Sequence, residues 1–145
     1  MRFNFDFLRR LLIVGVVLLV VQFLVGMFVN VYEIVPFNVN FGSFAYSAQG
    51  IGFGLHHYVG AFVLLFAALV LAFGFRLKNA LLTKLSAIGL ALLIIAYLSG
   101  ITLIYLENNY LFSFTMAASF IFALIVYISA IFLTKKANTQ DSPPQ

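Results

Sequence analysis

Four long apolar stretches dominate the pattern of hydrophobic and polar positions along the chain. They run from Leu11 to Tyr32, from Ile51 to Phe75, from Leu85 to Leu106 and from Tyr110 to Thr134. Each is long enough to cross the hydrocarbon core of a bilayer, which takes about 20 helical residues. The pattern therefore predicts four membrane-spanning helices and leaves little of the chain for a soluble domain.

The composition agrees with a multi-pass membrane protein. Hydrophobic residues make up 64% of the 145 residues and charged residues only 8%, whereas roughly 25% of the residues of a soluble domain are charged. The mean hydropathy is +1.13. We therefore expect a multi-pass protein of the cell membrane whose first partner is the lipid bilayer.

The distribution of cations predicts the orientation. All eight Lys and Arg residues lie before the first span, between the second and the third, or after the fourth. Cytoplasmic loops are enriched in Lys and Arg, so we expect both termini in the cytoplasm. The net charge of +4 is thus a topology signal, and it implies no nucleic-acid partner.

Short connections between the spans predict an all-α architecture, a four-helix bundle of up-down-up-down topology. We expect one transmembrane domain over residues 1–136 and a disordered tail over residues 137–145. The longest connection, Glu33 to Gly50, mixes aromatic and polar residues and is expected to cap the outer end of the bundle. The chain has no cysteine, which excludes disulfides, thiolate metal sites and covalent heme attachment.

The only two histidines, His56 and His57, lie within the second span. Ionisable side chains inside a membrane are costly and are functional candidates by default. Adjacent residues of a helix point about 100° apart, so the two imidazoles cannot both face one central group. His56 is therefore the candidate ligand, and we expect His57 to meet the outer loop, lipid headgroups or a cofactor propionate.

Candidate residues from all four spans share one depth. At about 1.5 Å per residue, these residues lie about 8 to 9 Å from the outer ends of their spans: Gly26, His56, Gly100 and Met116. A low-spin heme between helices needs an imidazole, a second ligand such as a thioether, and small residues that leave room for a flat ring. We therefore predict a heme b with His56 as one iron ligand and with either Met116 or no residue as the other, and with Gly26, Gly100 and His57 around it.

Each of these residues also has an explanation that needs no cofactor. His56 can lie at the interface or hydrogen-bond a neighbouring helix, and Met116 can fill space in the core. Glycines allow close helix contact in membrane bundles. Gln22 and Ser99 can form interhelical hydrogen bonds worth only about 0.6 kcal/mol each.

Short motifs occur in the first three spans. The first span has Gln22 and Gly26 four residues apart, the second has His56-His57-Tyr58-Val59-Gly60, and the third has the run from Ala96 to Thr102. They resemble the Gln-x-x-x-Gly, His-Arg-x-x-Gly and Gln-x-x-Leu-Gly-x-x-Thr motifs of heme A synthase, a membrane enzyme that oxidises a methyl group of heme O. The resemblance implies one four-helix half of that eight-helix fold and a heme pocket, with His56 at the ligand position and His57 at the arginine position.

The chain departs from that family at functional positions. Met116 stands about where the family has its second heme-ligating histidine, and Phe53 stands where it usually has an acidic residue implicated in catalysis. No other carboxylate lies within a span, so acid–base chemistry has no evident partner. We therefore name no catalytic residue and do not expect heme A synthase activity.

The sequence leaves two classes of function open. The first is a small b-type cytochrome or heme-handling protein that passes electrons or delivers heme near the outer face. The second is a non-catalytic accessory subunit of a respiratory or other membrane complex, whose partners are other membrane proteins or further copies of the chain. A transporter is disfavoured because the spans lack internal proline and buried charge pairs.

Overall fold

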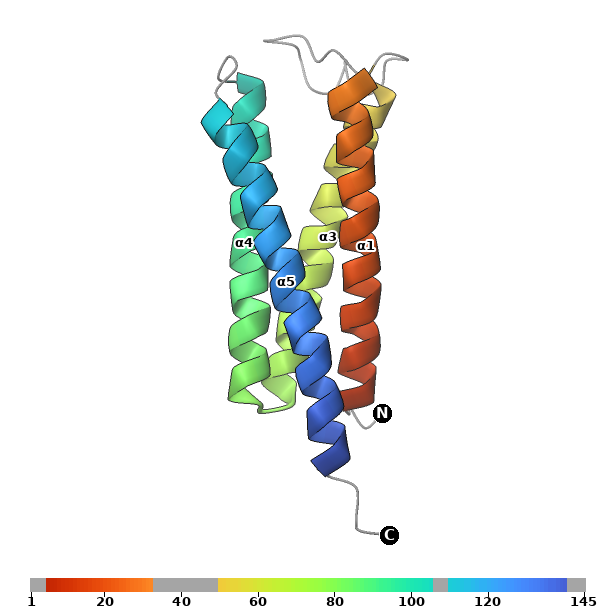
Figure 1. Ribbon diagram of the computed structural model, residues 1–145, viewed down its shortest axis with the longest axis vertical. Helices are drawn as coiled ribbons and strands as arrows, with labels where there is room; N and C mark the ends of the chain where they lie inside the picture. The colour runs from red at the N-terminus through yellow and green to blue at the C-terminus, as the bar shows by residue number, and fades with distance from the viewer. Residues whose placement is uncertain (1–4, 33–49, 106–109, 141–145) are drawn as a thin grey trace.

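The protein is a bundle of four long helices (Figure 1). The computed structural model describes residues 5–32, 50–105 and 110–140. The helices are α1 (Phe5–Tyr32), α3 (Ile51–Arg76), α4 (Ala80–Tyr105) and α5 (Tyr110–Gln140), and no strand occurs in the described ranges. All four are long and apolar enough to cross a membrane. The predicted all-α class with four spanning helices is confirmed.

Three helices extend by five residues or more beyond the apolar stretches that predicted them, and α3 extends by one. α1 begins at Phe5, α4 begins at Ala80 and α5 continues to Gln140. Hydropathy marks where a helix meets lipid, whereas the backbone stays helical through the polar interface until a cap or a breaking residue ends it. The first four residues of the predicted tail, 137–140, are therefore helical. The rest of that tail and the predicted outer cap lie outside the described residues.

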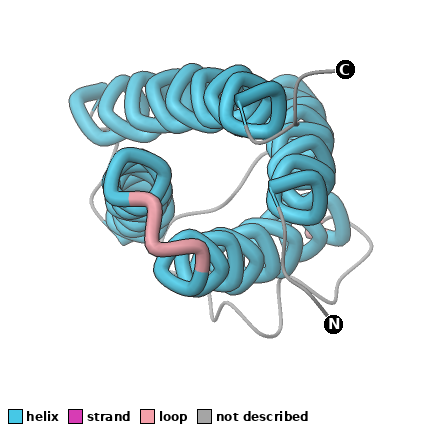
Figure 2. Tube along the Cα trace, turned by 90° about the horizontal axis from the view of Figure 1, so that it is seen from below, coloured by secondary structure: helices cyan, strands magenta, loops and turns pink. Residues whose placement is uncertain are grey.

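The helices form a ring in which each helix contacts two neighbours. α1 and α4 each contact both α3 and α5, whereas the described residues of the diagonal pairs, α1 with α4 and α3 with α5, make no close backbone contact. The view along the bundle shows the four helices around a common centre (Figure 2). The start of α1, the end of α5 and the α3–α4 turn lie at the same end (Figure 1), as the up-down-up-down topology requires.

A tight turn joins α3 to α4. The backbone N–H of Leu77 donates to the carbonyl of Phe73 at 3.1 Å, and Lys78 adopts the left-handed conformation with φ 53°. Asn79 then caps α4, because its side-chain oxygen accepts a hydrogen bond from the backbone N–H of Leu82 at 3.1 Å. Asparagine is among the best residues at this position because its side chain satisfies an amide that the helix leaves unpaired.

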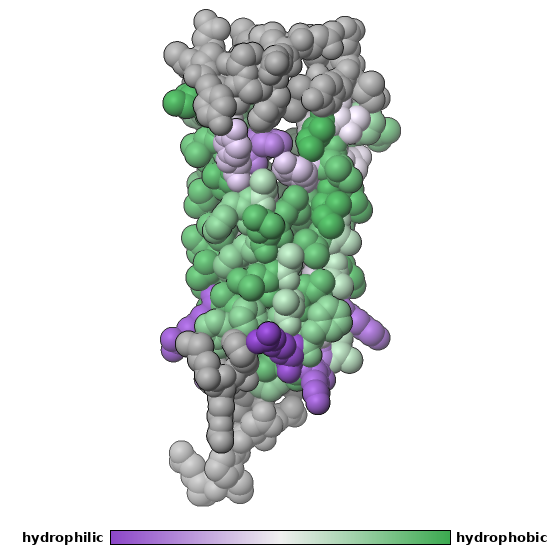
Figure 3. Space-filling view, turned by 180° about the vertical axis from the view of Figure 1, so that it is seen from behind, coloured by the Kyte–Doolittle hydropathy of each residue, from purple (hydrophilic) through white to green (hydrophobic). Residues whose placement is uncertain are grey.

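Charge is concentrated at the end of the bundle that holds this turn, here called the basic end. Seven Lys and Arg residues of the described ranges belong to this end: Arg9, Arg10, Arg76, Lys78, Lys84, Lys135 and Lys136. Figure 3 shows strongly hydrophilic residues at this end, an apolar middle, and a second, weaker polar band below the grey region at the opposite end. That opposite end, here called the polar end, holds the histidines.

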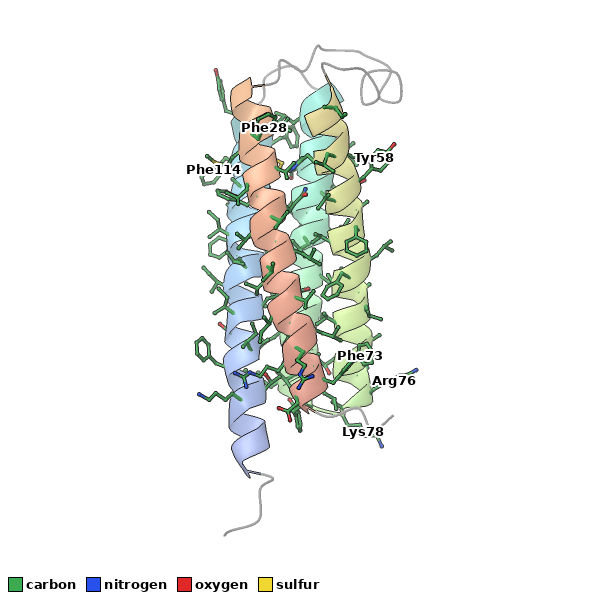
Figure 4. The ribbon with its side chains drawn as sticks, turned by 90° about the vertical axis from the view of Figure 1, so that its right-hand side faces the viewer. Phe28, Tyr58, Phe73, Arg76, Lys78 and Phe114 are labelled. Atoms are coloured by element: carbon green, nitrogen blue, oxygen red, sulfur yellow. The ribbon has the colours of Figure 1, made fainter. Side chains whose placement is uncertain are left out.

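Apolar side chains fill the interior and also cover the outside. The buried core lies in the middle of the bundle and towards the basic end, and comprises Leu8, Leu12, Leu19, Val63, Ala67, Val70, Leu82, Leu93, Ala123, Tyr127 and Ala130. It contains a cavity of about 10 Å³, room for about one water. Tyr58 and Phe114 point away from the bundle (Figure 4), as suits contact with lipid or with a membrane protein.

We expect Gly89→Ala to destabilise the contact between α4 and α5. A Cβ at Gly89 would lie 2.8 Å from Cζ and 2.9 Å from Cε2 of Tyr127, whose ring is only 3% exposed and cannot easily move. Such overpacking costs about 1 to 3 kcal/mol. Gly74→Ala is the matched control, since its Cβ would meet its nearest atom, Cα of Thr83, at 3.4 Å. Unfolding in detergent measures both, and equal losses would contradict the packing described here.

Candidate functional site

Two helices meet through a reciprocal contact near the polar end. Gln22 and Gly26 lie one turn apart on α1, and His56 and Gly60 lie one turn apart on α3. Because the helices are antiparallel, each polar side chain lies opposite the other helix's glycine. A Cβ at Gly26 would lie 2.7 Å from Cε1 of His56, and a Cβ at Gly60 would lie 3.0 Å from Nε2 of Gln22. A side chain at either position would therefore force the opposing polar side chain to shift.

Hydrogen bonds lock this contact. Nε2 of Gln22 lies 2.8 Å from the backbone carbonyl oxygen of His56 and 3.1 Å from its Nδ1. An amide nitrogen donates and does not accept, so it donates one hydrogen to each. Nδ1 is therefore the unprotonated nitrogen, and the neutral imidazole carries its proton on Nε2. This tautomer is assigned from the hydrogen-bond geometry.

His57 turns towards a different helix. Its Nε2 lies 3.0 Å from the hydroxyl oxygen of Tyr97 on α4, and the two ring centroids are 5.3 Å apart. The predicted divergence of the two histidines is thus observed, with His56 facing α1 and His57 facing α4. Tyr97 lies within the third-span motif, but the sequence did not indicate it as the partner of His57.

Met116 makes a separate contact between α4 and α5. A Cβ at Gly100 would lie 3.1 Å from Sδ of Met116, so the thioether occupies the space beside that glycine. Met116 and His56 come from the diagonal helices α5 and α3, which make no close backbone contact among the described residues. The four residues predicted to surround one pocket therefore form two pairs, Gly26 with His56 and Gly100 with Met116.

The side chains as placed do not fit an axially ligated heme. The imidazole edge that carries both nitrogens rests against α1, since a Cβ at Gly26 would lie 3.2 Å from Nδ1 and 3.5 Å from Nε2 of His56. The sequence predicts a porphyrin in the space beside Gly26, whereas in the structure the His56 ring fills it. A histidine that binds metal through Nε2 normally donates its Nδ1–H, whereas this Nδ1 faces a donor.

The reciprocal contact could have been found from spacing. The sequence named Gln22 as a candidate for an interhelical hydrogen bond, and the structure confirms it with His56 as the partner. The signal was the same four-residue spacing from polar residue to glycine in two consecutive, antiparallel spans. Because the two spans are antiparallel and share this spacing, the glycine of each span lies opposite the polar residue of the other. Neither motif shows this arrangement when it is considered alone.

Comparison with known proteins adds no relative. A scan against protein-family models, a search of curated proteins and a search of solved structures each find no match. The resemblance to heme A synthase therefore stays an expectation from short motifs. Fold and site together define a multi-pass helical membrane protein whose polar residues meet between helices at one end.

Replacing Gln22 should weaken the contact between α1 and α3. Gln22→Met keeps the length of the side chain and removes both hydrogen bonds to His56, so we expect a loss of about 1 to 2 kcal/mol of unfolding free energy in detergent or bicelles. Thr102→Val is the control, because the Thr102 hydroxyl bonds only Leu98 O within its own helix and should change stability by less than about 0.5 kcal/mol. A Gln22→Met protein as stable as wild type would show that the contact contributes nothing.

The geometry also gives an expectation for heme. Protein purified in mild detergent from heme-replete cells should show no Soret band and should take up no heme on titration, because the imidazole edge is occupied by α1 and Gln22. A Soret band with reduced-minus-oxidised features that His56→Ala removes and Met116→Leu shifts would contradict this. That outcome would establish the heme site predicted from the sequence.

Proposed function

We propose that the protein is a non-catalytic accessory subunit of a larger membrane complex, in which its helices contact other membrane proteins. The observation that carries this proposal is a set of small residues on the outside of the bundle. Ala68 and Ala72 on α3 and Ala87 and Ala91 on α4 are all exposed, and each pair lies one helical turn apart. Small residues at this spacing let the backbones of two membrane helices approach closely.

Small outward residues are informative because lipid does not require them. Lipid chains pack equally well against large apolar side chains, and α1 presents such a face with Val14, Val17 and Val21 exposed. The face of α1 thus suits lipid, whereas α3 and α4 each expose a pair of alanines among larger apolar side chains such as Leu65 and Ile88. Both alanine pairs lie in the half of the bundle nearer the basic end, where a partner helix could rest on either helix.

The interior supports the same proposal. The histidines that were candidates for cofactor binding form hydrogen bonds between helices, His56 with Gln22 and His57 with Tyr97. Only 22% to 28% of the residues in the central window of each span are buried. Each helix therefore leaves many side chains at least partly accessible to lipid or to a partner outside this chain.

Tagged chain expressed at its natural level should migrate in native gels as part of an assembly larger than the chain alone. Ala87→Leu with Ala91→Leu should lower the assembled fraction about tenfold, equivalent to ~1.4 kcal/mol of lost packing, because the larger side chains hold a partner helix away. Val17→Leu with Val21→Leu on α1 is the matched control and should leave the assembled fraction unchanged.

Two outcomes would overturn the accessory role. One is a wild-type chain that is extracted from its own membrane as a monodisperse single copy. The other is an assembly whose mass spectrum contains this chain alone, since the chain would then be a homo-oligomer. An assembly with other membrane proteins in fixed stoichiometry is the expected result.

A further inference from the structure

One atom of the reciprocal contact has no partner. Gln22 is only 7% exposed, and its Oε1 is buried with no hydrogen-bond partner. Both hydrogens of the same amide are already used on His56. A buried carbonyl oxygen without a donor is unfavourable, and it is more so within a membrane, where bulk water cannot compensate.

Rotating the amide does not remove the problem. The rotated amide would put Oε1 2.8 Å from the backbone carbonyl oxygen of His56, the distance at which Nε2 now lies, and two acceptors would face each other. It would also move the amide hydrogens to the place where Oε1 now has no partner. The orientation that satisfies His56 is therefore the one that leaves Oε1 in need of a donor.

We propose that Gln22 Oε1 is the centre of a small binding site, between α1 and α3 at the polar end, for a neutral hydroxyl group from outside the chain. The occupant donates its hydroxyl hydrogen to Oε1. The hydroxyl belongs either to a water molecule that enters from the polar end or to a hydroxyl-bearing molecule dissolved in the membrane. The site is independent of any protein partner and goes beyond the accessory role.

The charge distribution limits the occupant to a neutral donor. Among the described residues the one carboxylate is Asp6, which lies at the basic end. No described residue therefore offers a cation beside Gln22 a counter-charge, and a buried unpaired charge costs far more than an unpaired carbonyl. An anion there would be buried without a counter-charge as well, because the described Lys and Arg residues lie at the basic end. A hydroxyl supplies the missing hydrogen without either cost.

Infrared spectroscopy of a single labelled carbonyl tests the proposal directly. Changing Gln49, Gln140 and Gln145 to Asn leaves Gln22 as the only glutamine, so glutamine labelled with ¹³C at its side-chain carbonyl reports that atom alone. The full chain is measured in its native membrane and again after purification into synthetic lipid without hydroxyl-bearing molecules. Labelled propionamide in water and in dry alkane gives the bonded and free reference frequencies.

We expect the Gln22 carbonyl band at the lower, bonded frequency in the native membrane. If it stays there in synthetic lipid, the donor is water. If it moves to the free frequency there and returns when the extracted native lipids are added back, the donor is a membrane-soluble hydroxyl compound. A band at the free frequency in both preparations would overturn the proposal.

The amide orientation needs its own check, because a rotated amide bonded by His56 Nδ1–H would also lower the band. The ¹⁵N signal of His56 Nδ1 in the same chain separates the two cases. We expect the position of an unprotonated, accepting nitrogen. A signal of the protonated type at Nδ1 would overturn the proposal whatever the carbonyl band shows.

Discussion

The contact between α1 and α3 rests on a steric condition that must be met before any hydrogen bond can form. Gln22 and His56 each pack against a glycine of the opposing helix, where a Cβ would force the polar side chain to shift. Glycine inside a helix costs roughly 0.5 to 1 kcal/mol relative to alanine. Here that cost makes room for an amide and an imidazole whose hydrogen bonds replace the water they lost on insertion. The two glycines and the two polar residues are therefore one unit, and a change in one alters what the others can do.

The same principle recurs around the ring with apolar partners. Gly100 admits the thioether of Met116 and Gly89 admits the ring of Tyr127, both between α4 and α5. In a membrane the helices gain little from the hydrophobic effect, so close packing and interhelical hydrogen bonds supply much of their association. A glycine facing a large side chain provides such packing without burying a polar group. The α1–α3 contact differs because its large side chains are polar and thus fix direction as well as distance.

The sequence predicted the helices well and the site only in part, for physical reasons. Apolar length and the absence of internal proline determine spanning helices almost alone, so the four spans were found. The predicted start of α1 was too late and the predicted end of α5 too early, since the helices reach Phe5 and Gln140. Hydropathy marks the part of a helix that meets lipid, whereas backbone hydrogen bonding determines where the helix ends. Depth along a helix also predicted correctly that Gly26 and His56 lie at one level. Depth carries no information on azimuth, however, so it could not show that His56 faces α1.

The protonation of His56 Nδ1 differs between the two interpretations of this site, a heme site and a contact between helices. An iron ligand at Nε2 of His56 would keep its proton on Nδ1, whereas the amide of Gln22 requires Nδ1 to accept. The amide in turn is oriented by the backbone carbonyl of His56, a group that no change of tautomer can alter. A motif of glutamine, glycine and histidine is therefore compatible with a cofactor site or with a helix contact, and here the backbone carbonyl of His56 fixes the orientation of the amide. In this chain it orients the amide for a helix contact and leaves Gln22 Oε1 as the unsatisfied group.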